Sequence, residues 1–288
     1  MQTKSVFEDK KEIERLCVQN KLLYAYEAPV FRALFSEKKD YSVLDVGCND
    51  GTKTVERFSS ADIKKVIGLE YNSALASKAQ ESYGGEKFSF YCLDVESDDF
   101  VARLNDIMCK SAVKGFDVIY LSFVLMHLKD VKKLLELLHL FLNENGKILI
   151  VEANDAYSSL NDSSNRLLDD FLEILKKDRY SGNREIGANI CDMLGESGYT
   201  DVKVWYDAII AGEGEGEKKQ AIFTTFFSYL PEDIAILLDA EPENKEYQSW
   251  NAWMSENYDA LKSQIVSDDS KISMGVKILS ADGGKNNA

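Results

Sequence analysis

The stretch from Val43 to Thr52, VLDVGCNDGT, carries the strongest chemical signal in the sequence. An apolar run ends there in a turn with glycines at positions 47 and 51. Glycine lets the backbone approach a ligand closely, and the helix expected next would present its N-terminus to that ligand. The dinucleotide fingerprint G-x-G-x-x-G would need glycines at 47, 49 and 52, where this chain has Gly47, Asn49 and Thr52. The pattern therefore predicts a ligand-binding turn, but not that of a nicotinamide dehydrogenase.

Polar residues also follow the next three apolar runs of the chain. Glu70 ends the second run, where its carboxylate could accept hydrogen bonds from two neighbouring ribose hydroxyls. Asp94 follows the third run and could accept a hydrogen bond from an exocyclic amine such as that of adenine, and Ser122 ends the fourth. An acid at the end of one strand is a weak signal. Four successive polar ends favour one binding site, because ligands of doubly wound sheets bind at the carboxyl ends of the strands.

Together these residues resemble the class I S-adenosylmethionine-dependent methyltransferases over residues 41–152. The segment DVGCNDG is similar to their D-x-G-x-G-x-G loop, with Asn49 in place of the middle glycine, and FVLMHL is similar to their stretch after the fourth strand. The resemblance implies S-adenosylmethionine as the cofactor and S-adenosylhomocysteine as the product. It implies that the methionine and ribose of the cofactor contact Asp45, Gly47, Cys48, Asn49 and Gly51, and that Glu70 binds the ribose hydroxyls. It also implies that Tyr71, Asp94 and Val95 lie around the adenine. Ser122, Phe123 and His127 would lie at the methionine end.

The N-terminal helix of such enzymes often folds over the cofactor. Gln19, Tyr24 and Tyr26 are the candidates for that contact in this chain. A plain packing role for these side chains is the alternative, and the sequence leaves it open.

Methyl transfer from a sulfonium requires alignment of acceptor, methyl and sulfur, and exclusion of water, without a covalent protein intermediate. His127 is the candidate general base, because it follows the fourth strand, where this family places acceptors. A lone histidine in an apolar run is more often a packed residue, so that alternative stays open. Asn154 and Asp155 form a second polar cluster after the fifth strand. No metal is expected, because Ser122 stands where metal-dependent catechol-type members carry an aspartate.

Short apolar runs alternate with segments of helical spacing from residue 41 onward. The candidate strands are Tyr41–Val46, Lys65–Glu70, Phe88–Cys92, Phe116–Ser122, Lys147–Glu152, Asp201–Ala208 and Ser273–Ser280. The candidate helices are 7–36, interrupted by Pro29, then 51–59, 72–82, 98–112, 130–143 with a stop at Asn145-Gly146, and 184–197. This alternation predicts parallel strands with helices on both faces. With the resemblance, the expected fold class is α/β: a Rossmann-like, doubly wound, seven-stranded, mostly parallel sheet with an antiparallel last strand.

The alternation stops after residue 208. A Gly/Glu loop, 211–217, precedes an aromatic-rich block over 218–264 that has helical spacing. We therefore expect residues 1–40 to form an N-terminal helical cap, 41–213 with 265–288 to form the methyltransferase domain, and 214–264 to form a helical insert that acts as an acceptor lid. The GGKNNA tail is expected to fray.

The charge of the chain bears on its partners. The 288 residues include 34 Lys and Arg against 49 Asp and Glu, a formal net charge of −15. Nucleic-acid binding rests on clustered basic residues, whereas the basic residues here form isolated pairs, and the [DN]-P-P-[YF] tetrad of amino-methylating DNA enzymes is absent. A small-molecule acceptor is the leading expectation. Methylation of a protein or RNA, and cofactor binding without catalysis, remain alternatives.

The cysteines and the N-terminal sequence indicate the cellular compartment of the protein. Five cysteines without a C-x-x-C pair fit buried thiols in a reducing compartment better than a disulfide framework. The N-terminus lacks the apolar region of a secretory signal, and no apolar run approaches the roughly 20 residues that span a bilayer. We expect a cytoplasmic protein without membrane contact, and the sequence leaves its oligomeric state open.

Overall fold

The computed structural model describes residues 10–36, 39–60, 62–162 and 164–284. The start of the helix expected over 7–36 and the end of the expected frayed tail lie outside these residues. The chain forms two compact units. The sheet unit comprises Ala28–Ala153, Ile186–Tyr206 and Lys277–Ala288. The helical unit comprises Met1–Glu27, Asn154–Glu185 and Asp207–Val276.

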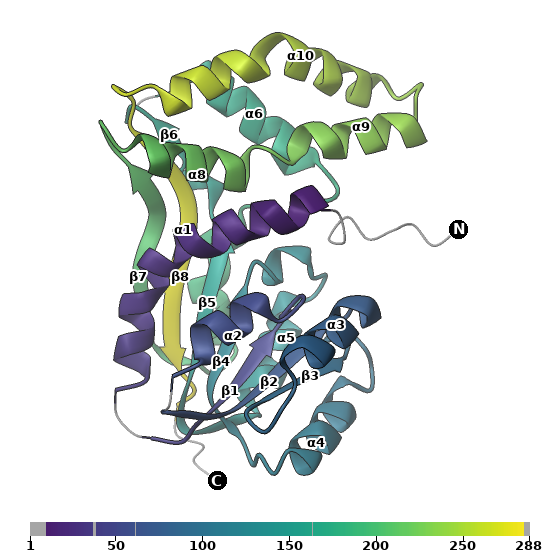
Figure 1. Ribbon diagram of the computed structural model, residues 1–288, viewed down its shortest axis with the longest axis vertical. Coiled ribbons are helices and arrows are strands. Elements are labelled where there is room, and N and C mark those ends of the chain that lie inside the picture. The colour runs from purple at the N-terminus through teal and green to yellow at the C-terminus, as the bar shows by residue number, and fades with distance from the viewer. Residues whose placement is uncertain (1–9, 37–38, 61, 163, 285–288) are drawn as a thin grey trace. The chain divides into compact units, whose positions relative to one another are not determined.

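An eight-stranded sheet has the order β3-β2-β1-β4-β5-β8-β6, with β7 also paired to β8 (Figure 1). The first five strands pair in parallel, and the C-terminal strands run antiparallel, as the short β6 does to β8. The strands are β1 Tyr41–Val46, β2 Ile63–Glu70, β3 Phe88–Cys92, β4 Phe116–Ser122, β5 Leu142–Ala153, β6 Ser159–Leu160, β7 Thr200–Ala211 and β8 Ile272–Asp282. The expected α/β class and mostly parallel sheet are confirmed, and the two-residue β6 is the strand that the sequence did not indicate.

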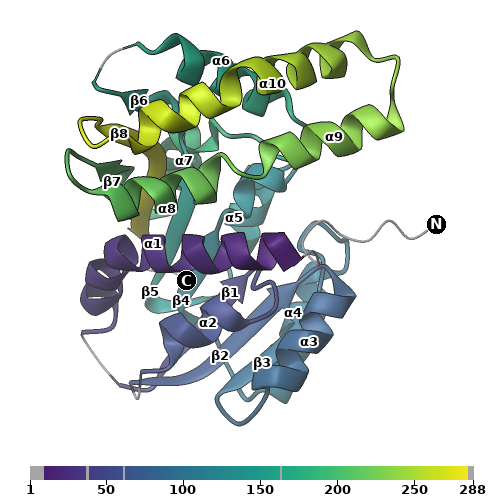
Figure 2. The same cartoon turned by 45° about the horizontal axis from the view of Figure 1, so that its top comes forward.

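Helices cover both faces of the sheet because successive residues of a strand point to opposite faces. On one face Ile119 and Leu121 of β4 pack with the apolar sides of α4 (Phe100–Lys110), α5 (Val131–His139) and α7 (Ile186–Glu196). On the other face Tyr120, between them in sequence, packs edge-on against Phe31 and Phe58. Phe58 ends α2 (Thr52–Phe58), and α3 (Ser73–Tyr83) packs against β2 and β3 (Figure 2).

The helix expected over 130–143 is present as α5, but its expected stop at Asn145-Gly146 is wrong. The helix α5 ends at His139, and β5 already begins at Leu142. Asn145 has a φ of 63°, a left-handed conformation that Asn tolerates, and it lies inside β5. The register of β5 with β4 shifts between Phe116 and Val118. The Asn-Gly pair therefore belongs to an irregular strand instead of a helix end.

The helical unit contains α6 (Arg166–Lys177), α8 (Gly216–Phe226), α9 (Leu230–Ala240), α10 (Lys245–Val266) and most of α1 (Lys10–Leu34). The helix α10 packs along α6, α8 and α9. Two expectations need correction here: α1 continues through Pro29 without interruption, and α6 was not expected. The block over 218–264 is helical, as its spacing indicates.

Among the described residues, one stretch, Gly216–Ala240, has the length and hydropathy of a membrane span, with a window of mean hydropathy 1.4. That window is 50% buried, and the stretch is divided into α8 and α9. Its residues Ile222, Phe226, Ile234 and Leu237 are buried. One such stretch is weak support for a membrane span, because the core face of a folded helix has the same composition.

The five cysteines carry free thiols. The expectation that they are buried holds only for Cys48, since Cys17, Cys92 and Cys109 are exposed and Cys191 is half-buried.

Candidate active site

The turn between β1 and α2 has an unusual backbone that explains its residue types. Gly47, Asn49 and Gly51 have φ values of 74°, 51° and 80°. This left-handed region is open to glycine and, among other residues, is best tolerated by Asn and Asp. Asn49 therefore occupies the middle glycine position of the loop without a large conformational penalty. A Cβ on Gly47 would lie 2.4 Å from Cγ2 of Val124, so only glycine fits between the turn and the segment after β4.

Asp45 anchors this turn from inside β1. Its side chain is 4% exposed, and its Oδ2 accepts a hydrogen bond of 2.6 Å from the hydroxyl of Thr54, in the first turn of α2. Cys48 is buried next to it. Burial and the nearby carboxylate of Asp45 raise the pKa of the Cys48 thiol well above its usual value, so this thiol packs and does not act as a nucleophile.

Glu70 lies at the end of β2 and is held by backbone groups. Its Oε2 accepts from the N–H of Asn49 at 3.0 Å, and its Oε1 accepts from the N–H of Asn72 at 2.9 Å. Burial raises the pKa of this carboxyl above its ordinary value. Each carboxylate oxygen can accept more than one hydrogen bond, so Glu70 retains acceptor capacity for a hydroxyl-bearing ligand.

The residues expected around adenine lie at the ends of β2 and β3 in the same unit. Tyr71 is 64% exposed directly after Glu70, so its ring is accessible for stacking. Asp94 is exposed, and its Oδ1 accepts from the N–H of Glu96 at 2.9 Å. Val95 is half-buried and packs against the main core.

The end of β4 brings Ser122 and Phe123 to this edge of the sheet. The amine of Lys53, from the first turn of α2, donates to the hydroxyl of Ser122 at 2.7 Å. Phe123 has a φ of 54°, a strained value for a bulky residue, and its N–H donates to the carbonyl of Val151 at 2.8 Å. His127 ends the short 3₁₀ helix Leu125–His127 and is exposed.

A carboxylate that the sequence analysis missed supports this segment. Glu152, near the end of β5, is fully buried, and its Oε1 accepts from the N–H groups of Val124 and Leu125 at 2.7 and 2.6 Å. Its Oε2 is buried without a hydrogen-bond partner among the described residues. Burial raises the pKa of Glu152 to about 7. The signal was available, because KILIVE is an apolar run that ends in an acid, as the run before Glu70 does.

The structure thus brings twelve of the expected site residues into one unit, at the carboxyl ends of β1 to β4: Asp45, Gly47, Cys48, Asn49, Gly51, Glu70, Tyr71, Asp94, Val95, Ser122, Phe123 and His127. Gln19 and Tyr24 belong to the helical unit. Gln19 is 9% exposed and accepts a hydrogen bond from Arg15, whereas Tyr24 is 51% exposed.

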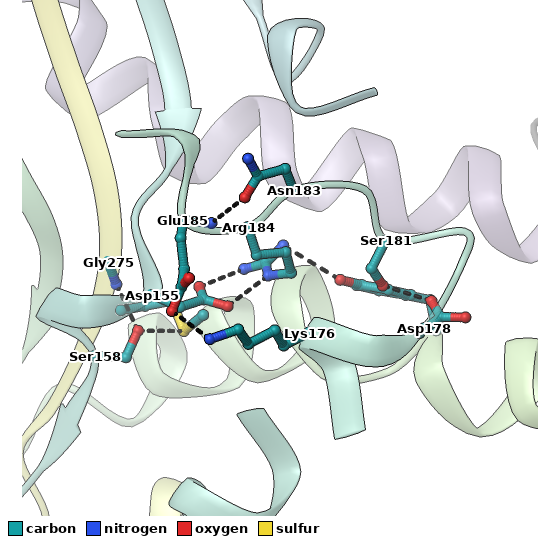
Figure 3. A network of polar contacts seen from close by, with 11 residues as sticks. Asp155, Ser158, Lys176, Asp178, Ser181, Asn183, Arg184, Glu185 and Gly275 are labelled. Carbon is teal, nitrogen blue, oxygen red and sulfur yellow. Dashed lines mark hydrogen bonds and ion pairs between the residues drawn. The ribbon is translucent and has the colours of Figure 1, made fainter. Parts of the chain in front are cut away.

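The helical unit contains a second polar cluster, around Arg184 (Figure 3). The guanidinium of Arg184 is 4% exposed and bonds both oxygens of Asp155, at 2.7 and 2.8 Å. It also approaches the hydroxyl of Tyr229 at 3.4 Å. Arg184 and Asp155 line a polar groove of about 340 Å³ beside α6. Asn154, next to Asp155, is fully buried, and its side-chain amide has no partner among the described residues. Arg184 is therefore a buried ion-pair partner of Asp155 and not a solvated loop charge.

A comparison with protein families matches residues 18–204 to a methyltransferase domain, which covers more than half of the chain. A comparison with curated protein sequences gives no match.

Solved structures with the same fold share little sequence with this chain. The YcgJ protein from Bacillus subtilis is 15% identical, with a TM-score of 0.53 over 91% of this chain and 100% of that one. A putative methyltransferase from Bacillus halodurans C-125 is 14% identical, with a TM-score of 0.52 over 89% and 98% of the two chains. A phosphoethanolamine N-methyltransferase from Haemonchus contortus, solved with S-adenosylhomocysteine, is 14% identical, with a TM-score of 0.52 over 97% of this chain but 59% of that one. At these identities the likeness shows the fold.

Proposed function

The chain belongs to the class I S-adenosylmethionine-dependent methyltransferase family, and from this premise we propose that it methylates a small-molecule acceptor. The proposal places the cofactor at the carboxyl ends of β1 to β4. The observation that supports it is a hydrogen bond of 3.0 Å, which the N–H of Asn49 in the glycine turn donates to the carboxylate of Glu70. That bond joins the two parts of the site that would hold the two halves of an adenosine-containing ligand.

The residues at these strand ends fit such a cofactor. Backbone approach requires Gly47, since a side chain there would collide with Val124. The exposed ring of Tyr71 lies next in sequence to the buried carboxylate of Glu70, which is the pairing that an adenosine needs: a flat apolar surface beside an acceptor for ribose hydroxyls.

When bound, S-adenosylmethionine supplies an electrophilic methyl group on a sulfonium. The proposed roles of the protein are to bind and orient. Glu70 would accept from the ribose hydroxyls, Asp94 would accept from the adenine amine, and the backbone at Ser122 and Phe123 would contact the methionine end. His127 is the proposed base for an acceptor that must lose a proton.

A small acceptor is favoured over nucleic acid by charge. The helical unit contains 26 acidic residues against 15 basic ones, which is unsuited to binding a phosphate backbone. The groove beside α6, at about 340 Å³, falls at the lower end of the usual range for small-molecule sites.

Incubation with methyl-labelled S-adenosylmethionine and a fractionated metabolite extract tests the proposal. We expect label in the small-molecule fraction, and no change in labelling after protease or RNase treatment of the extract. Label that disappears on protease or RNase treatment would instead identify a macromolecular acceptor. The variant Glu70→Ala, run in parallel, should lose the label if transfer depends on the proposed cofactor site.

His127→Asn tests the base separately. An asparagine preserves the polarity of the side chain but cannot take a proton, so we expect kcat to fall by about 10²–10⁴-fold. Unchanged kcat would assign His127 a packing role.

A further inference from the structure

The segment that follows β4, residues 123–127, leaves the sheet in a conformation that needs support from other residues. Phe123 has a strained φ of 54°, and the 3₁₀ helix Leu125–His127 begins two residues later. The first N–H groups of a helix have no acceptor within that helix, and the preceding residue, Val124, provides no side-chain cap. The backbone of this segment therefore depends on acceptors from elsewhere in the sheet unit.

Two adjacent residues of β5 supply these acceptors. The carbonyl of Val151 accepts from the N–H of Phe123 at 2.8 Å. Oε1 of Glu152 accepts from the N–H groups of Val124 and Leu125 at 2.7 and 2.6 Å. Oε2 of Glu152 has no partner among the described residues, so the side chain directs its hydrogen bonds to this segment. Glu152 thus caps the 3₁₀ helix from a neighbouring strand.

The position of Val124 affects the glycine turn. A Cβ on Gly47 would lie 2.4 Å from Cγ2 of Val124, so the backbone of the turn and this side chain are in close contact. The same turn is joined to Glu70 through the N–H of Asn49. Because packed atoms have little free space, a shift of Val124 would press on the turn or leave a gap beside it.

The position of His127 depends on the same short helix. Its N–H donates to the carbonyl of Val124 at 3.0 Å, and the N–H of Leu128 donates to the carbonyl of Leu125 at 3.2 Å. The two residues whose carbonyls hold the end of the helix are therefore the two whose N–H groups bind Glu152.

We propose that Glu152 is a positioning residue for the methyl transfer: by fixing Val124 and Leu125, it sets the placement of His127 relative to the glycine turn. The inference rests on the proposed function, which places the cofactor at this turn and the base at His127. Glu152 is fully buried, so its effect on the reaction would act through the segment.

A purely structural role is the alternative for this side chain. A buried carboxyl is weak evidence of added stability, because the cost of its desolvation opposes the gain from its hydrogen bonds. The two roles differ in what a substitution changes. A structural role would alter the stability of the whole fold, whereas a positioning role alters the segment after β4 out of proportion to stability.

Three substitutions on β5 separate positioning from stability. Glu152→Gln keeps an oxygen for both N–H groups, and Glu152→Leu keeps an approximately similar shape without any acceptor. Ile150→Val, at a buried position two residues earlier on the same face of the strand, removes a methylene group from the core and no hydrogen bond to the segment. Denaturant midpoints of the three variants show how far each is destabilised.

The first readout is local and does not require the reaction. The chain has two histidines, His127 and His139, so selective labelling with ¹⁵N-histidine gives two backbone amide signals, which His127→Asn assigns. Hydrogen exchange at the His127 amide reports its bond to Val124, and His139, at the end of α5, is the internal reference.

We expect Glu152→Leu to speed exchange at His127 relative to His139 by about 10–150-fold, the factor that corresponds to the loss of a hydrogen bond to a charged group. Glu152→Gln and Ile150→Val should keep the ratio close to that of the wild type. An unchanged ratio in Glu152→Leu, or an equal change at both histidines, would overturn the proposal.

If Glu152→Leu does not fold, Glu152→Asp takes its place. Its carboxylate is one methylene shorter, so the segment must move or lose a bond, and we expect the same direction of change at His127. An exchange ratio equal to that of the wild type in this variant would overturn the proposal.

The second readout is the rate of label transfer in the fractionated extract at saturating S-adenosylmethionine. We expect Glu152→Leu to reduce the initial rate by about 10²-fold, because a small misplacement of reacting groups has an effect of that size. Glu152→Gln should recover most of the rate, and the affinity for S-adenosylhomocysteine should fall by a smaller factor than the rate. A similar loss of rate in Ile150→Val would assign the effect to stability and overturn the proposal.

Calorimetry of S-adenosylhomocysteine binding to the wild type separates this inference from the proposed function. Binding and label transfer in the wild type, with an unchanged rate in Glu152→Leu, would overturn the positioning role and leave the proposed function standing. Neither binding nor label transfer in the wild type would contradict the proposed function, and the exchange ratio at His127 would still decide whether Glu152 positions the segment.

Discussion

The backbone N–H of Asn49 donates to Oε2 of Glu70 at 3.0 Å, so the turn after β1 and the carboxylate at the end of β2 hold each other in place. The other oxygen of Glu70 accepts from Asn72, the residue that caps α3. One side chain thus fixes two loops at the edge where the cofactor is proposed to bind. Its removal should therefore affect ligand binding more than a surface change would.

Replacing Glu70 by Ala should weaken S-adenosylhomocysteine binding by about 10–150-fold. The reason is the loss of a charged acceptor, which contributes roughly 1.5–3 kcal/mol. Calorimetry measures the affinity, and Glu81→Ala, an exposed acid of α3, is the control. An unchanged affinity in Glu70→Ala would mean that this strand end does not contact the ribose.

Gly47→Ala should destabilise the fold and reduce cofactor binding. The new Cβ would lie 2.4 Å from Val124, and the φ of 74° is strained for any residue with a side chain. Strain of this kind costs about 1–3 kcal/mol before the collision is counted. Gly85→Ala is the matched control, because a Cβ there meets nothing within 4 Å. Denaturant unfolding of both variants provides the comparison, and equal midpoints would contradict the close approach.

Thr54→Val should cost about 1–3 kcal/mol of stability, although it preserves the shape of the side chain. The substitution removes the 2.6 Å bond to Asp45 in a buried setting. Thr54→Ser keeps the hydroxyl and should recover most of the loss. If Thr54→Val unfolds at the same denaturant concentration as the wild type, the bond contributes nothing.

The strands of the sheet could be predicted because each is determined by the pattern of apolar residues in its own sequence. The bounds of β1, β3 and β4 agree with the expected strands to the residue. The strands β1 and β4 are buried, and buried parallel strands are continuous apolar runs between polar turns. The contacts that support the site could not be predicted in the same way. Glu152 meets Val124 and Leu125, and Arg184 meets Asp155, only after the fold has brought distant segments together. The amphipathic α6 was missed, although its apolar positions Leu168, Phe171 and Leu175 have helical spacing.

The buried carboxyl of Glu152 should make the free energy of unfolding depend on pH. Its pKa is about 7 in the folded protein against an ordinary value of 4.5, and the cause is burial. Between these values the folded state binds more protons than the unfolded state, so the free energy of unfolding falls as the pH rises through this window. The slope approaches about 1.4 kcal/mol per pH unit for one carboxyl. The contribution is complete near pH 4.5 and is lost above pH 7.

Asp233 also makes the free energy of unfolding fall as the pH rises, and it does so over a wider pH range, because its pKa is about 8. The comparison that isolates Glu152 is therefore the difference between the wild type and Glu152→Gln, measured as denaturant midpoints from pH 5 to pH 8. Glutamine keeps an oxygen for the N–H groups of Val124 and Leu125 but cannot ionise, so the variant should lose less stability than the wild type as the pH rises. Parallel curves for the two proteins would show that Glu152 is ionised throughout this range, and that its two short hydrogen bonds outweigh the cost of its burial.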